Sequence, residues 1–211
     1  MFIRTLTFSL LALIATSLPG IAQQTQTALV AGGCFWCVES DFRRVEGVTD
    51  VRVGFTGGTT SNPSYDDVVR GRTEHLEAAL ITFDPGQISY NRILHLFLRS
   101  IDVLDDGGQF CDRGAHYTTA IFATPAQTAQ AEAAVEAAEE ELGQSIVTPV
   151  RAAGAFYEAD DFHQNYANST ERTLTRFGWV ERRDAYKRYR EGCGRDRRVR
   201  ELWGDSAPFV N

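Results

Sequence analysis

The sequence predicts a single α+β domain, an α/β two-layer sandwich in which helices flank one mixed β-sheet, followed by an irregular C-terminal tail. Its composition, 43% hydrophobic and 23% charged residues over 211 positions, is that of a globular domain with a sizeable core. Segments with strand periodicity alternate with segments of helical periodicity, which is typical of a sheet covered by helices. No internal repeat or long linker interrupts this order, so we expect one folding unit.

The first 22 residues predict a secretory signal peptide. Arg4 is their only charge, residues 5–18 are uncharged, and small residues lie one and three positions before Gln23. We expect cleavage after Ala22, a single domain over residues 23–211, and a periplasmic or secreted protein. The apolar run is short for a membrane span, so we expect no stable membrane insertion; a retained anchor is the alternative.

The first half of the domain is predicted to contain three strands and two helices. A strand over residues 27–31 leads through a diglycine turn into a helix, and a second strand ends at Thr56-Gly57-Gly58. The strongest strand pattern covers residues 75–83, and Asp84-Pro85-Gly86 ends it. The two helices are predicted from apolar residues at helical spacing: Val38, Phe42 and Val45 in the first, and Ile93, Leu94, Phe97, Leu98 and Ile101 in the second.

The second half begins with a polar loop through Cys111 and a strand over residues 117–123. Thr124-Pro125-Ala126-Gln127 then supplies an N-cap, a first-turn proline and a capping-box glutamine for a helix that Gly143 ends. Strand-like residues return over residues 146–157. The remainder is mostly helical and polar.

Cys34 is the most informative residue, because it lies between the diglycine turn and the first turn of the expected helix. Unpaired backbone N–H groups and the helix dipole stabilise an anion at that place. We therefore expect the pKa of the Cys34 thiol to fall from about 8.5 toward neutrality, which makes it a candidate nucleophile. Two aromatic residues, Phe35 and Trp36, follow it directly.

Glu77 is the second informative residue. Strand alternation places its carboxylate on the same face as Ala79, Ile81 and Phe83. A carboxyl group in apolar surroundings has a raised pKa and can act as a general acid near neutral pH. The pattern alone leaves open that this face is solvated. Tyr65 and Tyr117 are weaker candidates, because tyrosines near strand ends are more often core residues.

Charge and cysteine content limit the possible partners. The net charge is −7, so nucleic acid is not expected as a partner. Residues 181–211 form a basic tail, which we expect to be solvated and helical in part. The four cysteines are Cys34, Cys37, Cys111 and Cys193, too few for a disulfide scaffold in a chain of this length. We expect a monomer.

Six short motifs then carry a resemblance to the A-type peptide methionine sulfoxide reductases, in matching order and spacing over residues 28–166. The motifs are Gly33-Cys34-Phe35-Trp36 with Glu39, Gly54-Phe55-Thr56-Gly57-Gly58, Asn62-Pro63-Ser64-Tyr65, His75-Leu76-Glu77 with Phe83-Asp84-Pro85, Asp112-Arg113-Gly114 before Tyr117, and Phe156-Tyr157 before Phe162-His163-Gln164. The chain departs from the commonest pattern at Glu74, at His116, and above all at Cys37, where a glycine is usual.

The resemblance implies a thiol-dependent reduction of methionine S-sulfoxide, free or in oxidised proteins, as a repair reaction. Cys34 would attack the sulfoxide sulfur and Glu77 would protonate its oxygen, to which Tyr65 and Tyr117 would donate hydrogen bonds. Phe35 and Trp36 would form an apolar wall for the S-methyl group. Asp112 would orient a water molecule or a tyrosine near the site.

The oxygen transfer would leave a sulfenic acid on Cys34, which condenses with a second thiol. Cys193, between two glycines, is the preferred resolving cysteine; Cys37 and Cys111 are the other candidates, and a structural pair between Cys111 and Cys37 is a further expectation. A thioredoxin-like donor, or dithiothreitol in its place, would reduce the disulfide, with no metal or organic cofactor.

Two other functions remain open. The first is a thiol-disulfide oxidoreductase that uses Cys34 and Cys37 as a Cys-x-x-Cys pair, although this gives no role to Glu77, Tyr65 and Tyr117. The second is a zinc-binding or disulfide-stapled interaction module. It is weakly supported, because the sequence has no second Cys-x-x-Cys or histidine pair at ligand spacing.

Overall fold

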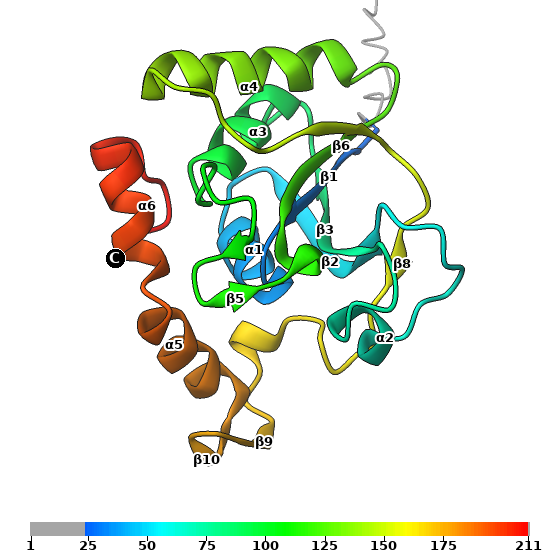
Figure 1. Ribbon diagram of the computed structural model, residues 1–211, viewed down its shortest axis with the longest axis vertical. Coiled ribbons are helices and arrows are strands. Elements are labelled where there is room, and N and C mark those ends of the chain that lie inside the picture. The colour runs from blue at the N-terminus through cyan, green and yellow to red at the C-terminus, as the bar shows by residue number, and fades with distance from the viewer. Residues whose placement is uncertain (1–23, 211) are drawn as a thin grey trace, which may run out of the picture.

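The structure is a computed structural model that describes residues 24–210, so the predicted signal peptide lies outside the described residues. Its main sheet has six strands in the order β7-β6-β1-β3-β2-β8 (Figure 1). Strand β7 runs parallel to β6 and the other neighbours are antiparallel, which confirms the predicted mixed sheet. The strands are β1 (Gln26–Gly32), β2 (Val48–Thr56), β3 (Leu76–Phe83), β6 (Thr119–Ala123), β7 (Val150–Ala152) and β8 (Tyr157–Glu158).

Smaller elements complete the described part of the chain. Two separate strand pairs are β4 (Gly108–Gln109) with β5 (Asp112–Arg113), and β9 (Arg172–Thr175) with β10 (Gly178–Glu181). The helices are α1 (Phe35–Phe42), α2 (Tyr65–Val69), α3 (Tyr90–Leu98), α4 (Thr128–Leu142), α5 (Arg182–Gly192) and α6 (Arg195–Trp203), with short 3-10 turns η1 (Ala115–Tyr117), η2 (Tyr166–Asn168) and η3 (Gly204–Ser206). None of the helices within residues 24–210 has both the length and the apolar character needed to cross a membrane.

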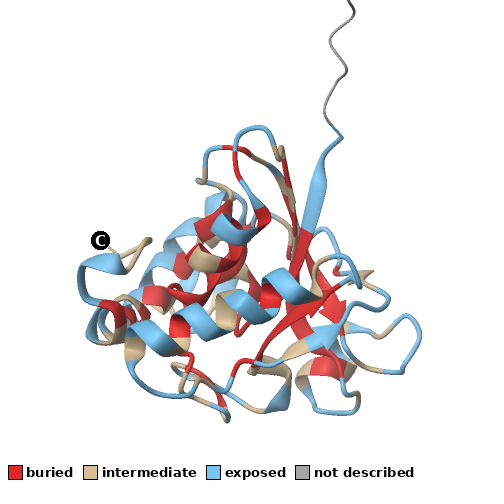
Figure 2. Cartoon of the chain, turned by 90° about the horizontal axis from the view of Figure 1, so that it is seen from above, coloured by how far each residue is buried: buried red, intermediate tan, exposed pale blue. Residues whose placement is uncertain are grey.

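The largest core cluster lies between one face of the sheet and the helices. Val30, Ile81 and Phe83 from the strands pack there with the apolar stripes of α1 and α3 and with alanines of α4. The opposite face carries a smaller cluster that includes Ala31 and Phe122. Buried residues accordingly gather along the central strands and on the helix faces turned toward them (Figure 2). This arrangement confirms the two-layer sandwich.

Helix α4 shows how far its ends agree with the capping residues predicted from the sequence. The backbone N–H of Thr124 donates to the side chain of Gln127, which is one of the two bonds of a capping box, but the Thr124 hydroxyl donates to the same oxygen and does not accept from the N–H of Gln127. The regular helix nevertheless begins at Thr128, because residues 124–127 form a turn that precedes it. At the other end Gly143 adopts the left-handed conformation expected of a C-terminal glycine.

The C-terminal segment is more ordered than the predicted irregular and solvated tail. Helices α5 and α6 follow the β9–β10 hairpin along one side of the molecule (Figure 1). Each buries one face, with Tyr186 and Trp203 among the buried side chains. Arg190 and Arg195 are buried too, since Arg190 pairs with the fully buried Asp41 of α1 and Arg195 donates to the backbone oxygen of Ser100. The basic composition of this segment predicted a solvated tail, but these two arginines bind groups inside the fold.

Candidate active site

The end of β1 and the start of α1 bring Cys34 to its predicted place. Cys34 is the N-cap residue of α1 and is only 7% exposed. Gly33 before it has φ +78°, and a Cβ there would lie 2.5 Å from Cβ of Gln109. A side chain at position 33 would therefore be both strained and blocked, so the turn that presents Cys34 requires glycine.

Cys37 lies beside Cys34, one turn into the helix, and the two thiols are hydrogen-bonded partners. This bond and burial raise the pKa of Cys34 above its ordinary value, whereas the same bond, together with Arg195 and Arg190, lowers the pKa of Cys37 to about 7. The prediction of a lowered pKa for the Cys34 thiol is therefore wrong. The pair, rather than one cysteine, holds a negative charge near neutral pH.

Glu77 reaches this site from β3 and is 2% exposed, so the solvated alternative for its face is wrong. Its Oε2 accepts a hydrogen bond of 3.0 Å from the backbone N–H of Phe35, in the first turn of α1. Burial raises the pKa of the Glu77 carboxyl to about 8, although the Phe35 bond opposes this. Glu77 is therefore protonated at neutral pH and can donate a proton.

Two hydroxyl groups converge on the same space from different elements. Tyr65 is the first residue of α2, which Ser64 caps, and Tyr117 ends η1. Burial raises the pKa of both phenols, so that each stays a hydrogen-bond donor. The hydroxyl groups thus add neutral donors to the acid that Glu77 supplies.

Cys34, Glu77 and the two tyrosines line a small cavity of about 70 Å³. Its walls are the seven predicted catalytic and substrate-binding residues and one more from α5: Cys34, Phe35, Trp36, Tyr65, Glu77, Asp112, Tyr117 and Tyr189. The ring of Phe35 lies 6.0 Å from that of Phe55, and Trp36 is stacked on Tyr166 with ring centres 3.8 Å apart. The cavity therefore combines one nucleophile, one acid and several hydroxyl groups with an apolar aromatic wall.

Tyr189 is the site residue that sequence reasoning missed. Its hydroxyl donates to Oδ2 of Asp112 from the inner face of α5. The spacing of Tyr186 and Tyr189 on one helical face could have indicated a buried side, but the surrounding arginines favoured a solvated helix. The hydrogen bond gives Asp112 a partner and places a third tyrosine at the cavity.

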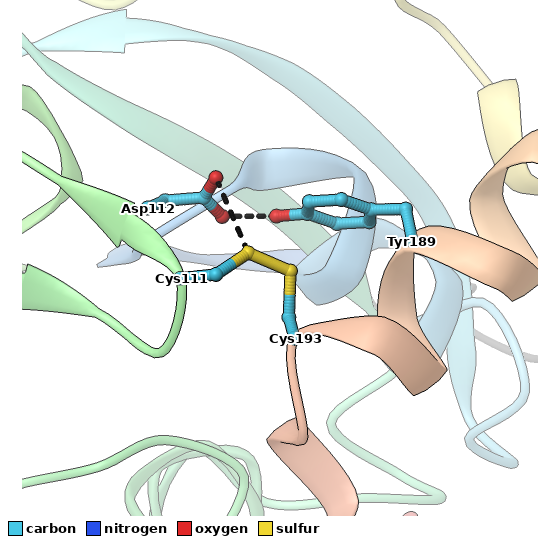
Figure 3. The surroundings of a disulfide bond; sticks show 4 residues. All are labelled: Cys111, Asp112, Tyr189 and Cys193. Atoms are coloured by element: carbon cyan, nitrogen blue, oxygen red, sulfur yellow. Dashed lines mark hydrogen bonds between the residues drawn. A yellow bond between two sulfur atoms is a disulfide. The ribbon is translucent and has the colours of Figure 1, made fainter. Parts of the chain in front are cut away.

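A disulfide joins Cys111 to Cys193 next to this hydrogen bond (Figure 3). It ties the segment that carries Asp112 to the end of the helix that carries Tyr189. The suggested pairing of Cys111 with Cys37 is therefore wrong, because Cys37 lies inside α1 and stays a free thiol with Cys34. The preferred resolving cysteine, Cys193, has its sulfur engaged in this bond.

Other motif residues hold the walls in place. His75 holds the loop after β2, which leads to Tyr65, through both ring nitrogens: Nδ1 accepts from the N–H of Gly58, and Nε2 donates to the backbone oxygen of Thr60. Gln164 bonds both backbone groups of Val53, and Glu39 accepts from the N–H of Asn165. These bonds fasten the segment that precedes Tyr166 against β2 and α1.

No cluster of three or more His, Cys, Asp or Glu side chains suited to a metal ion occurs in residues 24–210. The cysteines of the proposed zinc module are divided between a disulfide and the Cys34–Cys37 pair. What the site offers is thiol chemistry assisted by a proton donor. The geometry thus defines a thiol-based oxidoreductase site.

Comparisons with known proteins agree with this class. The sequence matches the family described as peptide methionine sulfoxide reductase over residues 26–193. It is 44% identical to the peptide methionine sulfoxide reductase MsrA 2 of Rhizobium meliloti over 96% of both chains, and 41% identical to MsrA 2 of Caulobacter vibrioides over 92% of this chain and 94% of that one. The chain therefore belongs to the peptide methionine sulfoxide reductase family and is an oxidoreductase.

Solved structures agree at the level of the fold. The methionine sulfoxide reductase A of Corynebacterium diphtheriae aligns with a TM-score of 0.66 at 30% identity, over 78% of this chain and 87% of that one. The reduced form of Mxr1 from Saccharomyces cerevisiae also gives 0.66, at 25% identity over 74% and 92%. The predicted fold and family are confirmed together.

Proposed function

We propose that this enzyme reduces methionine S-sulfoxide to methionine with Cys34 as nucleophile and Glu77 as general acid. The observation that carries the proposal is the shared cavity, where a buried thiol, a protonated carboxyl group and two phenol hydroxyls line one space. Its small volume suits the end of one side chain. Phe35 and Trp36 supply the apolar wall against which an S-methyl group would rest.

In the first step the Cys34 sulfur attacks the sulfoxide sulfur, and Glu77 transfers its proton to the sulfoxide oxygen. Tyr65 and Tyr117 donate hydrogen bonds to that oxygen as charge develops on it. At rest Cys37 is the more acidic of the two thiols, so the proton that they share passes from Cys34 to Cys37 as the attack begins, and Cys34 reacts as the thiolate. The protonated oxygen then passes to the Cys34 sulfur as both this oxygen and Cys34 break their bonds to the substrate sulfur, so methionine leaves as the thioether and Cys34 holds the oxygen as a sulfenic acid.

In the second step another thiol loses its proton and attacks the sulfenic sulfur as the thiolate; the S–O bond breaks as the disulfide forms, and the oxygen leaves as water with that proton. Cys37 is the nearest candidate for this thiolate, because it contacts Cys34 and its pKa is lowered to about 7, so that it can lose the proton it received. Since Cys34 lies at the N-cap, outside the regular helix, a bond between the two does not have to form within helical geometry. We therefore favour Cys37 over Cys193.

A thioredoxin-like dithiol then supplies the two electrons that reduce the disulfide, and dithiothreitol can replace it. The proposed reaction needs no metal or organic cofactor, since sulfur both accepts the oxygen and forms the bond that is reduced. The substrates are oxidised proteins or free methionine sulfoxide. Export to the periplasm or secretion, and a monomeric state, stay predictions.

A thiol-disulfide oxidoreductase is the second candidate function, favoured by the free Cys34–Cys37 pair at the start of a helix. It leaves the buried Glu77 and the tyrosine hydroxyls without a role. Reduction of insulin disulfides by the purified protein would support it.

The direct test uses the two separated epimers of methionine sulfoxide with dithiothreitol as reductant. We expect turnover of the S epimer and none of the R epimer. Turnover of neither epimer, together with reduction of insulin, would favour the second candidate.

A further inference from the structure

A second and larger hollow lies next to the catalytic cavity. Its volume is about 500 Å³, and it shares the side chains of Trp36, Asp112 and Tyr189 with the smaller cavity. Because the same side chains form a wall of both, the two hollows are neighbours. The rest of its lining comes mainly from the turn of the β9–β10 hairpin and from α5. None of the chemical steps above uses this part of the molecule.

The volumes suggest how a substrate is divided between the two hollows. The catalytic cavity has room only for the end of a side chain, so the main chain of a polypeptide substrate must lie outside it. Consecutive residues of an extended chain rise by about 3.3 Å each, so the residues next to the sulfoxide lie against the neighbouring surface. The larger hollow, hereafter the hairpin groove, has a volume typical of ligand sites.

The inner part of the hairpin groove is aromatic. Tyr186 and Tyr166 belong to the cluster that surrounds the two free thiols, and Tyr166 is stacked on Trp36. Phe177, at the turn of the hairpin, forms the outer wall. Surfaces of this kind favour an apolar or aromatic side chain.

The outer end of the groove is positively charged. The guanidinium groups of Arg176 and Arg188 lie 5.0 Å and 5.7 Å from the centre of the Phe177 ring. Both arginines are exposed, and within the part of the chain that the structure describes neither forms an ion pair. The net charge of the chain is −7, yet among the described residues these two cations beside the groove have no ion-pair partner, so they are available to a ligand. The only carboxylate of the lining, Asp112, accepts the hydroxyl of Tyr189; the charge of Arg176 acts on this carboxylate, but the two side chains form no ion pair.

From this arrangement we propose that the hairpin groove binds the polypeptide on one side of the methionine sulfoxide, and that it favours an acidic side chain one or two positions away. The proposal rests on the proposed function, because it assumes that the sulfoxide enters the catalytic cavity. Carboxylate groups would pair with Arg176 and Arg188, while apolar parts of the segment contact Phe177 and Tyr186. The substrate class is thus a flexible, acidic segment of an oxidised protein.

The first experiment compares kcat/KM for four substrates with dithiothreitol as reductant. They are free methionine sulfoxide and three peptides in which glutamate, glutamine or lysine flanks the sulfoxide on both sides. We expect kcat/KM for the glutamate peptide to exceed that for the lysine peptide by about 1.4- to 5-fold for each ion pair formed, which corresponds to the energies of exposed pairs. The preference should fall in 0.5 M NaCl, because salt at that concentration screens exposed charges.

Substitutions of the two arginines test whether they cause the preference for the glutamate peptide. Arg176→Gln should lower the ratio of kcat/KM for the glutamate peptide to that for free methionine sulfoxide, and Arg176→Gln with Arg188→Gln should lower it further. Lys187→Gln is the matched control, since Lys187 is an exposed cation of α5 that lies in a different hollow, together with Arg190 and Asp196. In that control the ratio should equal that of the unmodified protein.

Binding to the Cys34→Ser variant, measured by calorimetry, separates recognition from chemistry. Tighter binding of the glutamate peptide than of the lysine peptide supports the groove even where no sulfoxide is reduced. If the sulfoxides are reduced but the peptides neither bind nor react differently, the groove proposal is overturned and the proposed function stands. An effect of Arg176→Gln confined to turnover with a protein dithiol donor would also overturn it, because the groove would then bind the reductant.

Discussion

Cys34 and Cys37 lie within one turn of chain, whereas Cys111 and Cys193 come from segments separated by 82 residues. The first pair is buried, free and hydrogen-bonded, with the Glu77 carboxyl group in the same cavity as Cys34. The second pair is bonded and ties the Asp112 segment to the end of α5. Residue type alone does not distinguish these cysteines.

The difference shows that the surroundings assign the roles. A thiol becomes reactive where a charge on sulfur is stabilised and where a proton donor meets the substrate. A disulfide that joins distant segments instead restricts the chain. We expect the first pair to carry the catalytic cycle and the second to hold Asp112 and Tyr189 in place.

The largest effect is expected from Cys34→Ser, which should abolish sulfoxide reduction while the fold is retained. A serine hydroxyl cannot supply the soft anionic nucleophile that the first step needs. Circular dichroism tests whether the fold is retained, and turnover of the S epimer with dithiothreitol measures sulfoxide reduction. Cys111→Ser is the matched control, and activity in Cys34→Ser with loss in Cys111→Ser would reverse the assignment of the pairs.

Glu77→Gln should slow the chemical step by about 10²- to 10⁴-fold, the contribution typical of a general acid. Glutamine can still accept the bond from the N–H of Phe35, so the start of α1 should be preserved. Single-turnover release of methionine measures the rate, and iodoacetamide labelling of Cys34 measures thiol reactivity. An equal loss in both would indicate a structural role for Glu77.

The pKa of Glu77 also predicts how activity and stability depend on pH. The folded protein raises this pKa to about 8, so the carboxyl group is protonated below that value and activity should fall as pH rises through it. Stability should decrease between the ordinary pKa of about 4.3 and the folded value, because the folded state binds the proton more tightly there, by about 1.4 kcal/mol per unit of pKa difference. Urea unfolding at pH 5 and pH 9 should show that Glu77→Gln stabilises mainly at pH 9; equal effects at both would contradict this.

Replacement of both Cys111 and Cys193 by serine should lower the free energy of unfolding by about 2–4 kcal/mol. With dithiothreitol as reductant, kcat should change little, because neither sulfur lines the catalytic cavity. A modest rise in KM would follow from a looser Tyr189–Asp112 contact. Urea unfolding and steady-state kinetics test this, and a loss of kcat comparable to that of Cys34→Ser would contradict it.

The fold and most of the site followed from local signals in the sequence. Strand alternation around Glu77 and the glycine turn before Cys34 are short-range patterns, and both elements form as predicted. The resemblance to a known family gave Tyr65 and Tyr117 their roles and added Asp112; the structure brings all three to one cavity, and their roles stay predictions.

What could not be predicted depends on contacts between distant segments. The Cys111–Cys193 bond joins the end of α5 to the segment of β5, where Tyr189 also bonds Asp112, and no local pattern encodes that contact. Tyr189 was missed for the same reason. The pKa of Cys34 differs from the prediction made from the helix terminus, because the neighbouring Cys37 and burial both raise it.

The central claim is that Cys34 and Cys37 form the disulfide of the catalytic cycle while Cys111 and Cys193 stay bonded. The most direct test starts from protein with Cys34 and Cys37 reduced and the other pair oxidised, adds one equivalent of methionine S-sulfoxide, and maps the disulfides by mass spectrometry after rapid alkylation. We predict a peptide that links or contains Cys34 and Cys37 as a disulfide, with the Cys111–Cys193 link unchanged. A link between Cys34 and Cys193, with alkylated Cys111, would contradict the account.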